Sequence, residues 1–267
     1  MKKVSVIIPT YNRADKIERA IKSVLDQTFE DFDVIVVDDC SSDNTEAVVK
    51  TITDERVKYH RLDKNQGAAG ARNSGVAISE SEYIAFHDSD DEWLPDKLKK
   101  QFEYMQEHPQ VGMVYGKMHI VQSDLEGDFP NDSIEGKLEG EIYTDLLKRN
   151  TIGTPTMFLK RDEFEKVGGF DTNLRCLEDW DFAIRFSKEN KIGYINEPLM
   201  IVYSEPGGVS SNIGAYYETR CKIISENRDT MQKMGIFDDI VLDLFNRAQA
   251  SGVLNQVQAM LMSYLAR

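Results

Sequence analysis

The sequence VSVIIPTYNR, at residues 4–13, contains a short apolar run that ends in a polar segment. The run Val4 to Ile8 is too short for a signal-peptide core or a membrane span, so it predicts a buried strand. The next apolar residues fall on one face of a helix: Ile17, Ala20, Ile21, Val24 and Leu25. A strand followed by an amphipathic helix is typical of an α/β fold.

The same alternation continues over the first hundred residues. Further strands are predicted at residues 33–37, 57–62 and 83–86. The segments between them have helical spacing, with a capping signal in SSDNTEAVVKTI (41–52) and a Gly/Ala-rich stretch in GAAGARNSGVAIS (67–79). Strands that alternate with helices predict a parallel sheet that carries helices on both faces.

The rest of the chain is less regular. We expect a helix over 95–108 with Pro95 at its first position, and another over 177–190. Strands are expected at 111–121, at 154–160 and at 192–203, the last broken at Pro198, with a polar loop over 123–140. The pattern is helical from about Tyr216 to the end. We therefore expect a main domain over 1–215 and a helical extension over 216–267, which suits docking or dimerisation.

Composition excludes several classes of protein. Of the 267 residues, 41% are hydrophobic and 29% are charged, as in ordinary soluble proteins, and the net charge is −14. That charge repels nucleic-acid phosphates, and no basic patch offsets it. The three cysteines, Cys40, Cys176 and Cys221, are far apart and odd in number, which fits a reducing cytoplasm rather than a disulfide framework. No apolar run of about 18 residues predicts a membrane span.

Polar clusters follow three of the predicted strands. They are PTYNR (9–13), DDCSSDNT (38–45) and HDSDDEW (87–93). In an open parallel sheet, ligands bind outside the carboxyl ends of the strands. Either of the first two alone is better explained as a turn or a helix cap. Together, the three predict a binding site at one sheet edge.

The third cluster crowds Asp88, Asp90 and Asp91 behind the apolar run YIAF. Adjacent carboxylates repel one another unless a cation or solvent relieves the charge. Mn²⁺ or Mg²⁺ suits them, because these ions commonly bind one or two carboxylates together with substrate phosphates. An acidic surface turn is the alternative. A calcium loop of the EF-hand type is excluded by the spacing.

Five motifs in order resemble family 2 of the inverting glycosyltransferases. They are VSVIIPTYNR, VIVVDDCSSDNT, NQGAAGARNSG, YIAFHDSDDEW and LEDWDFAIR, and the resemblance covers residues 1 to 205. It implies the GT-A (nucleotide-diphospho-sugar transferase) fold, with a mostly parallel central sheet, helices on both faces and the C-terminal helices as an appendage. It also implies a metal-dependent enzyme that transfers a sugar from a nucleotide diphosphate to a hydroxyl group with inversion.

The resemblance implies roles for residues at matching positions. Tyr11 would lie against the nucleotide base, Asp39 would accept a hydrogen bond from the imide N–H of uracil, and Arg72 would approach the diphosphate or the base. The nucleotide-sugar site as a whole would contain Pro9, Tyr11, Arg13, Asp39, Arg72, Asp88 and Ser89.

The same resemblance implies the metal and catalytic residues. The family's DxD motif corresponds to Asp88, Ser89 and Asp90, which would contact the ribose and the metal. Asp91 leaves the register of the metal aspartate open. The family's ED motif corresponds to Glu178 and Asp179, and Asp179 is expected to be the base.

Residues around these motifs have simpler explanations as well. Asp181 and Arg185 are four residues apart and form a supporting pair on a helix. Trp180 either floors an acceptor sugar or belongs to the core. Tyr203 and the segment GGVSSN (207–212) are expected to close over the donor, because two glycines allow hinge motion.

The expected partners are a UDP-sugar and a glycan or lipid-linked acceptor, in the synthesis of cell-surface polysaccharide or glycoconjugate. We expect a cytoplasmic protein that lies peripherally at the inner face of the membrane, with membrane association or self-association through the C-terminal helices. A sugar-phosphate nucleotidyltransferase would need a basic Gly-rich loop after the first strand, and a dinucleotide-dependent oxidoreductase would need GxGxxG there. The segment PTYNR (9–13) after the first strand is neither, so both classes of enzyme are excluded. A catalytically silent nucleotide-sugar-binding or scaffolding module of the same fold is the remaining alternative.

Overall fold

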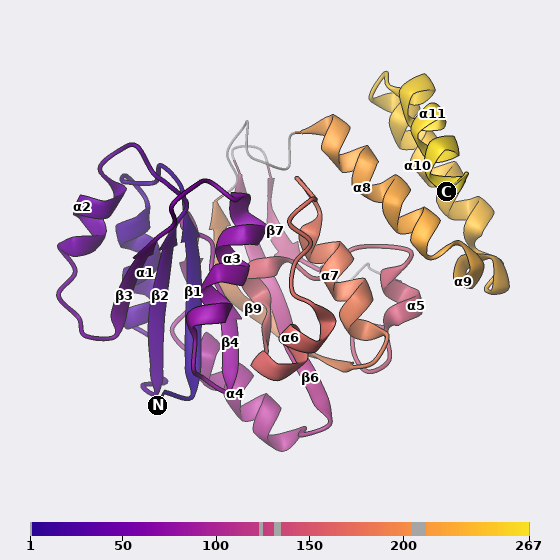
Figure 1. The fold of residues 1–267 in the computed structure, drawn as a ribbon. Coiled ribbons are helices and arrows are strands. Elements are labelled where there is room, and N and C mark those ends of the chain that lie inside the picture. The colour runs from indigo at the N-terminus through magenta and orange to yellow at the C-terminus, as the bar shows by residue number, and fades with distance from the viewer. Residues whose placement is uncertain (1, 123–124, 131–134, 204–211, 267) are drawn as a thin grey trace.

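The structure is a computed structural model that describes residues 2–122, 125–130, 135–203 and 212–266. One sheet runs through the molecule, with strand order β3-β2-β1-β4-β8-β6-β9-β5 and with β7 paired to β6. Helices pack on both of its faces, and the C-terminal helices extend beyond one end (Figure 1). This arrangement confirms the predicted α/β class.

The N-terminal half of the sheet is parallel, as predicted. β1 pairs with β2 and with β4, and β2 pairs with β3. Side chains of β1 alternate between the faces, so that Val4, Val6 and Ile8 enter one core and Ile7 enters the other. The strands are β1 (Val4–Thr10), β2 (Phe32–Asp38), β3 (Val57–Arg61) and β4 (Tyr83–Phe86).

Helices of this half occupy both faces. The apolar residues of α1 and α4 join the core that contains Val4, whereas those of α3 join the core that contains Ile7. Gly75 of α3 lies so close to β1 that a Cβ there would stand 2.4 Å from a methyl group of Ile7. The helices are α1 (Ile17–Leu25), α2 (Thr45–Lys50), α3 (Gly67–Ile78) and α4 (Lys97–Glu107).

Beyond β4 the sheet is mixed. β8 runs antiparallel to both of its neighbours, β4 and β6, while β6 and β9 are parallel. β5 pairs antiparallel with β9, and β7 pairs antiparallel with β6. The mostly parallel sheet of our prediction therefore describes the N-terminal half. The strands are β5 (Glu92–Trp93), β6 (Val111–Gln122), β7 (Leu125–Phe129), β8 (Phe158–Lys160) and β9 (Lys191–Tyr203).

Several predicted boundaries in this half were wrong. The polar stretch 123–140 contains β7, and only the end of 154–160 is a strand, because Thr154–Thr156 form a 3₁₀ turn. The last strand continues through Pro198: Gly116 pairs with Ile195 and Lys117 with Pro198, so two residues bulge out instead of ending the strand. Pro95 precedes α4, which begins at Lys97.

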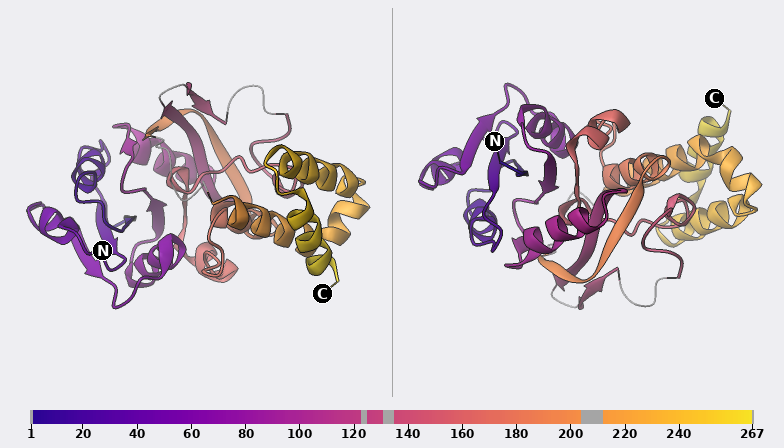
Figure 2. Two further views of the ribbon diagram at one scale, coloured as in Figure 1. Left: turned by 90° about the horizontal axis from the view of Figure 1, so that it is seen from above. Right: turned by 90° about the horizontal axis from the view of Figure 1, so that it is seen from below.

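The described chain from Ile213 onward is helical, as predicted, and its first helix begins before residue 216. The four helices are α8 (Ile213–Glu226), α9 (Arg228–Lys233), α10 (Phe237–Ala250) and α11 (Leu254–Leu265). They lie at the end of the molecule farthest from α2 (Figure 2). No helix within the described residues is long and apolar enough to cross a membrane. The division at residue 215, the membrane association and the self-association stay predictions.

α8 is attached to the main domain through a shared core. Tyr217, Cys221 and Ile224 belong to the same buried cluster as Trp180 and Phe182 of α7. The remaining helices of that half are α5 (Tyr143–Leu146), α6 (Arg161–Val167) and α7 (Glu178–Ser187).

Candidate active site

The loops after β1 and β2 are hydrogen-bonded into one unit at the carboxyl edge of the sheet. The backbone N–H of Asn12 donates to the Ser41 hydroxyl (2.9 Å), and that of Arg13 donates to the Thr45 hydroxyl (2.9 Å). Asn12 adopts a left-handed conformation, with φ of 53°. Tyr11 is 48% exposed beside it, so its ring is available to a ligand, whereas Pro9 is buried in β1.

Asp39 connects the end of β2 to the start of α3. Its two carboxylate oxygens accept the backbone N–H groups of Gln66 (2.6 Å) and Gly67 (2.8 Å). Burial raises the pKa of Asp39. The side chain thus has a structural function in addition to the predicted contact with uracil, which stays a prediction.

The three aspartates after β4 have different partners. Asp88 Oδ1 accepts a hydrogen bond from Arg72 Nη2 (2.6 Å), Asp90 Oδ2 lies 3.6 Å from Arg13 Nε, and Asp91 Oδ1 accepts the backbone N–H of Tyr203 (3.3 Å). Burial, followed by the charges of its two neighbours, raises the pKa of Asp91 to about 8. Burial and the charge of Asp88 also raise the pKa of Asp90. Ser89 is buried between them.

This loop fits a divalent cation that is shared with a diphosphate. No group of three or more His, Cys, Asp or Glu side chains within the described ranges is arranged to hold a metal ion by itself. Mg²⁺ and Mn²⁺ commonly take one or two protein carboxylates and complete their ligand shell with substrate phosphates and water. Burial and the neighbouring carboxylates raise the pKa values of Asp90 and Asp91, and a cation bound there would favour their ionised forms, with release of any bound proton. The register of the metal aspartate stays open.

Arg72 connects the acidic loop to α7. Its side chain is buried, and Nη1 donates to Glu178 Oε1 (2.8 Å) while Nη2 donates to Asp88. The two terminal nitrogens of Arg72 thus donate to carboxylates on two separate elements, the loop after β4 and helix α7. The predicted contact of Arg72 with the donor stays a prediction.

Glu178 and Asp179 are the first two residues of α7, and their surroundings differ. Glu178 is paired with Arg72, whereas Asp179 Oδ1 accepts hydrogen bonds from Asn150 Nδ2 (3.3 Å) and from the Trp180 backbone N–H (2.7 Å). Burial and, next, the charge of Glu178 raise the pKa of Asp179 to about 7. A carboxylate with such a pKa is suited to general-base catalysis near neutral pH.

The structure decides between the two explanations of Trp180. The ring is 6% exposed, and Nε1 donates to the carbonyl of Leu146 (2.7 Å), so Trp180 is a core residue. Asp181 and Arg185 form the predicted supporting pair, with 2.8 Å between Oδ2 and Nη2.

Tyr203 ends β9 close to the acidic loop. Its hydroxyl donates to Glu92 Oε2 (3.1 Å), and the Arg19 guanidinium lies 4.1 Å from the ring centroid. Residues 204–211 lie outside the described residues, and with them nearly all of the segment predicted to close over the donor. Cys40, Cys176 and Cys221 are free thiols, as predicted.

Sequence reasoning missed two side chains that the structure brings to the site. Arg19 donates to the backbone carbonyl of Asp90, and Asn150 contacts Asp179. An arginine on the polar side of an amphipathic helix and an asparagine in an unpatterned stretch carry no signal for such contacts.

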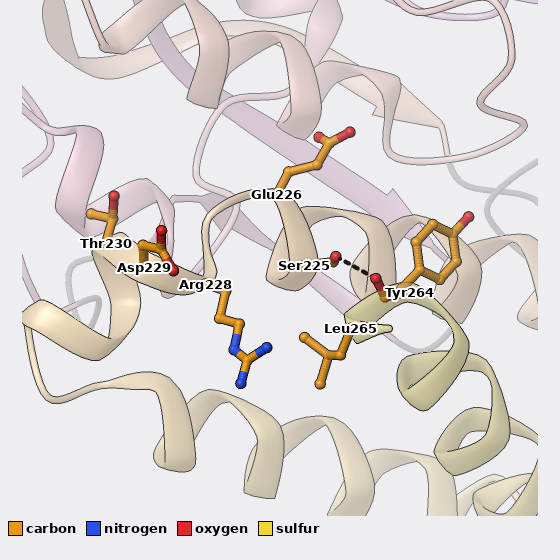
Figure 3. Close-up of a pocket in the computed structure, with 7 residues that line it drawn as sticks. All are labelled: Ser225, Glu226, Arg228, Asp229, Thr230, Tyr264 and Leu265. Carbon is orange, nitrogen blue, oxygen red and sulfur yellow. Dashed lines mark hydrogen bonds between the residues drawn. The ribbon is translucent and has the colours of Figure 1, made fainter. Parts of the chain in front are cut away.

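Two other cavities lie away from this edge. One, of about 220 Å³, lies in the tail between the α8–α9 corner and the end of α11 and is lined by residues that include Ser225, Arg228 and Tyr264 (Figure 3). The other, of about 470 Å³, is lined by residues 137–141 and Lys191. Neither is lined by a residue of the three polar clusters.

Solved structures with similar folds are glycosyltransferases. The S. aureus TarS fragment 1–349 in complex with UDP-GlcNAc matches with a TM-score of 0.69 at 19% identity, over 99% of this chain and 89% of that one. A mannosyltransferase of Pyrobaculum calidifontis, in complex with GDP-Man and Mn²⁺, matches with a TM-score of 0.64 at 20% identity, over 99% and 75%. The fold is therefore the GT-A fold of the glycosyltransferases.

Sequence comparisons identify the family. The sequence model described as "Glycosyl transferase family 2" matches residues 5–168. The chain is 35% identical to TuaG of Bacillus subtilis, over 78% of this chain and 82% of TuaG. TuaG is named a "Putative teichuronic acid biosynthesis glycosyltransferase". It is also 35% identical to WfgD of Escherichia coli, over 72% of this chain and 73% of WfgD; WfgD is named a UDP-Glc:alpha-D-GlcNAc-diphosphoundecaprenol beta-1,3-glucosyltransferase. The chain belongs to glycosyl transferase family 2.

Some relatives are longer than this chain. It spans 66% of an uncharacterized glycosyltransferase of Haemophilus influenzae and 28% of one of Rickettsia bellii.

Proposed function

We propose that the protein transfers a sugar from a UDP-sugar to a hydroxyl group of a glycan or lipid-linked acceptor, with inversion at the anomeric carbon. One observation carries the proposal. The acidic loop after β4 and the carboxylate pair of α7 belong to separate elements, and the buried Arg72 holds Asp88 and Glu178 at 2.6 and 2.8 Å. Such an arrangement suits a donor diphosphate on one side and an acceptor base on the other.

The donor would bind at the edge formed by the loops after β1, β2 and β4. Tyr11 has the exposure needed to stack on a base, and Asp39 is a buried acceptor for the uracil imide. Asp88 and Ser89 would contact the ribose. Asp90, with Asp88 or Asp91, would hold Mn²⁺ or Mg²⁺ together with the diphosphate. A bound divalent cation would stabilise the negative charge that grows on the leaving UDP.

The chemical step requires one proton transfer by the protein. Asp179 would take the proton of the acceptor hydroxyl while the acceptor oxygen forms a bond to the anomeric carbon on the side opposite the diphosphate. The bond between the anomeric carbon and the diphosphate oxygen breaks in the same step, and UDP leaves with that electron pair. A single displacement of this kind inverts the anomeric centre.

Asp179 is the better base of the two carboxylates. Glu178 is already engaged by Arg72, whose Nη1 lies 2.8 Å from Glu178 Oε1. Asp179 has a pKa of about 7 because of burial and the adjacent Glu178 charge. Its hydrogen bond with Asn150 would orient the carboxylate.

The substrate class is supported by relatives. The name of WfgD states a UDP-glucose donor and a lipid-linked diphosphate acceptor, and TarS has been solved with UDP-GlcNAc. We therefore favour a UDP-hexose or UDP-N-acetylhexosamine donor in the assembly of a cell-surface polysaccharide. A lipid-linked acceptor would place the reaction at the cytoplasmic face of the membrane.

A donor-hydrolysis assay tests the proposal. The protein is incubated with UDP-glucose or UDP-GlcNAc and Mn²⁺, and UDP release is measured with and without EDTA. Metal-dependent release is expected, and NMR of the transfer product with a soluble acceptor should give the β anomer from an α-linked donor. Tight binding of both UDP-sugars without any turnover would instead identify a silent nucleotide-sugar-binding module.

A further inference from the structure

Helix α8 of the C-terminal tail contacts the backbone just ahead of the Glu178–Asp179 pair. The hydroxyl of Thr219 donates to the carbonyl of Cys176, at 2.9 Å. Both residues are buried, with 1% and 4% exposure. Thr219 and Cys176 are 43 residues apart in sequence, so this bond brings the C-terminal tail to within two residues of Glu178.

The turn that receives this bond has an unfavourable backbone conformation. Leu177, the residue between Cys176 and α7, has φ of 58° and ψ of 26°. A leucine in the left-handed region is strained, and such strain persists only where surrounding contacts impose it. Leu177 stands at the N-cap position of α7, where its side chain makes no capping hydrogen bond. The Thr219 bond fixes the carbonyl immediately before the strained residue and is therefore suited to impose this turn.

A second contact joins α8 to the first turn of α7. Lys222 Nζ lies 3.1 Å from Asp181 Oδ1 and 3.1 Å from Asp171 Oδ2. The other oxygen of Asp181 is paired with Arg185. Thr219 and Lys222 are three residues apart and so lie on the same side of α8. Helix α8 thus contacts the chain on both sides of Asp179 in sequence: at Cys176, just before α7, and at Asp181, in its first turn.

The rotation of α7 decides which carboxylate faces the donor. Successive residues of a helix project about 100° apart, so a rotation of α7 by even part of that angle would turn Asp179 away from the reacting groups. Building on the proposed function, we propose that α8 is a positioning element of the active site. Thr219 would hold the Cys176–Leu177 turn in the conformation that points Asp179 at the acceptor hydroxyl.

Matched hydroxyl variants of α8 test this role. Thr219→Val removes the O–H group and keeps the branched shape, while Thr219→Ser keeps the hydroxyl. Ser225→Ala is the control, because Ser225 lies on the same helix and donates to the carbonyl of Tyr264 (2.9 Å), which joins α8 to α11 (Figure 3). Turnover of UDP-glucose or UDP-GlcNAc is measured as kcat and KM, with kcat expressed per UDP-binding site counted by calorimetry.

We expect kcat of Thr219→Val to fall by about tenfold or more while KM and UDP affinity stay unchanged, because a catalytic group displaced by about 1 Å loses much of its effect. Thr219→Ser should restore kcat to within about twofold of wild type, and Ser225→Ala should resemble wild type. Equal losses in Thr219→Val and Ser225→Ala would overturn the inference, as would a loss of UDP affinity in step with kcat.

A second variant covers the case in which Thr219→Val does not fold. Lys222→Met removes the charge between α8 and α7, and it too should lower kcat with KM unchanged. A normal kcat in Lys222→Met would overturn the role of α8. Failure of the proposed function looks different, because the wild-type protein itself would then release no UDP.

Discussion

The two halves of the candidate site are assembled in different ways. The proposed donor half, residues 2–93, joins its first two loops through contacts of modest sequence separation, such as Asn12 with Ser41 (29 residues apart) and Arg13 with Thr45 (32 residues apart). The acceptor half, residues 135–203 with the tail 212–266, centres on α7. Its carboxylates depend on distant partners, and Arg72 reaches Glu178 across 106 residues.

This difference has a physical origin. In the donor half, parallel strands bring their carboxyl ends to one edge, so any polar loop after a strand arrives at the site by topology alone. In the acceptor half, one helix must be held at a given rotation, and that requires packing and ion pairs from several elements. The donor half is therefore expected to tolerate changes in the tail, and the acceptor half is not.

Loss of the proposed metal ligand, Asp90, should have the largest effect and should fall on the donor half. Asp90→Asn keeps the size of the side chain and removes its charge, so both Mn²⁺-dependent UDP binding and transfer should become undetectable. Calorimetry with UDP and Mn²⁺ measures the binding. Asp238→Asn, on the exposed start of α10, is the control. If Asp90→Asn keeps metal-dependent binding and Asp91→Asn loses it, the metal register moves to Asp91.

Removal of the base should affect the acceptor half alone. Asp179→Asn should lower the transfer rate by roughly 10²–10⁴-fold and leave UDP affinity nearly unchanged. Glu178→Gln should be milder, because Glu178 is a partner of Arg72 rather than the proton acceptor. Steady-state transfer rates and UDP titrations of both variants provide the measurement. An active Asp179→Asn beside an inactive Glu178→Gln that still binds UDP would reverse the assignment.

Base recognition should show a smaller effect, again in the donor half. The wild type should bind UDP more tightly than CDP or ADP, and Asp39→Ala should erode that preference by about 1.5–3 kcal/mol, which is the usual contribution of a charged hydrogen bond. Because Asp39 also accepts the N–H groups of Gln66 and Gly67, the variant should be less stable as well. The ratio of UDP to CDP affinity separates the two effects. Equal affinity of the wild type for all three nucleotides would refute the assigned role.

The donor half could be predicted closely from the sequence because local patterns determine it. Short apolar runs separated by amphipathic segments located β1 to β4, and the three polar clusters lie at one edge of the sheet as expected. Tyr11, Asp39 and Asp88, the side chains predicted to contact the donor, follow within two residues of the end of β1, β2 or β4. Periodicity and strand topology suffice for such a site.

The acceptor half could be predicted only in part. The helix at Glu178 and the pair of Asp181 with Arg185 were found, because both follow helical spacing. The strand β7 was missed, and the strand predicted over 154–160 begins only at Phe158, since short strands in polar surroundings carry little periodicity. The contacts of Asn150 and Lys222 with α7 arise from packing of segments distant in sequence, which no local pattern encodes.

The pH dependence of transfer gives the smallest effect and separates the two carboxylates of α7. Asp179 must be ionised to accept a proton, and its pKa is about 7, so the rate should fall by roughly tenfold per pH unit as the pH decreases below 7. The charge of Glu178 is one cause of that raised pKa. In Glu178→Gln the pKa of Asp179 should therefore decrease, and the acid limb of the pH–rate profile should move to lower pH. The residual rate of Asp179→Asn should lack this limb.

The same titration should appear in the stability of the protein. The pKa of Asp179 in the folded state lies above its ordinary value of 3.8, so ionising the carboxyl costs folding free energy as the pH rises from about 4 to about 7. Asp179→Asn should remove that cost, so its melting temperature relative to wild type should be higher at pH 8 than at pH 4. For the transfer rate, an acid limb of the pH–rate profile that persists in Asp179→Asn and disappears in Glu178→Gln would show that Glu178 is the group that accepts the proton.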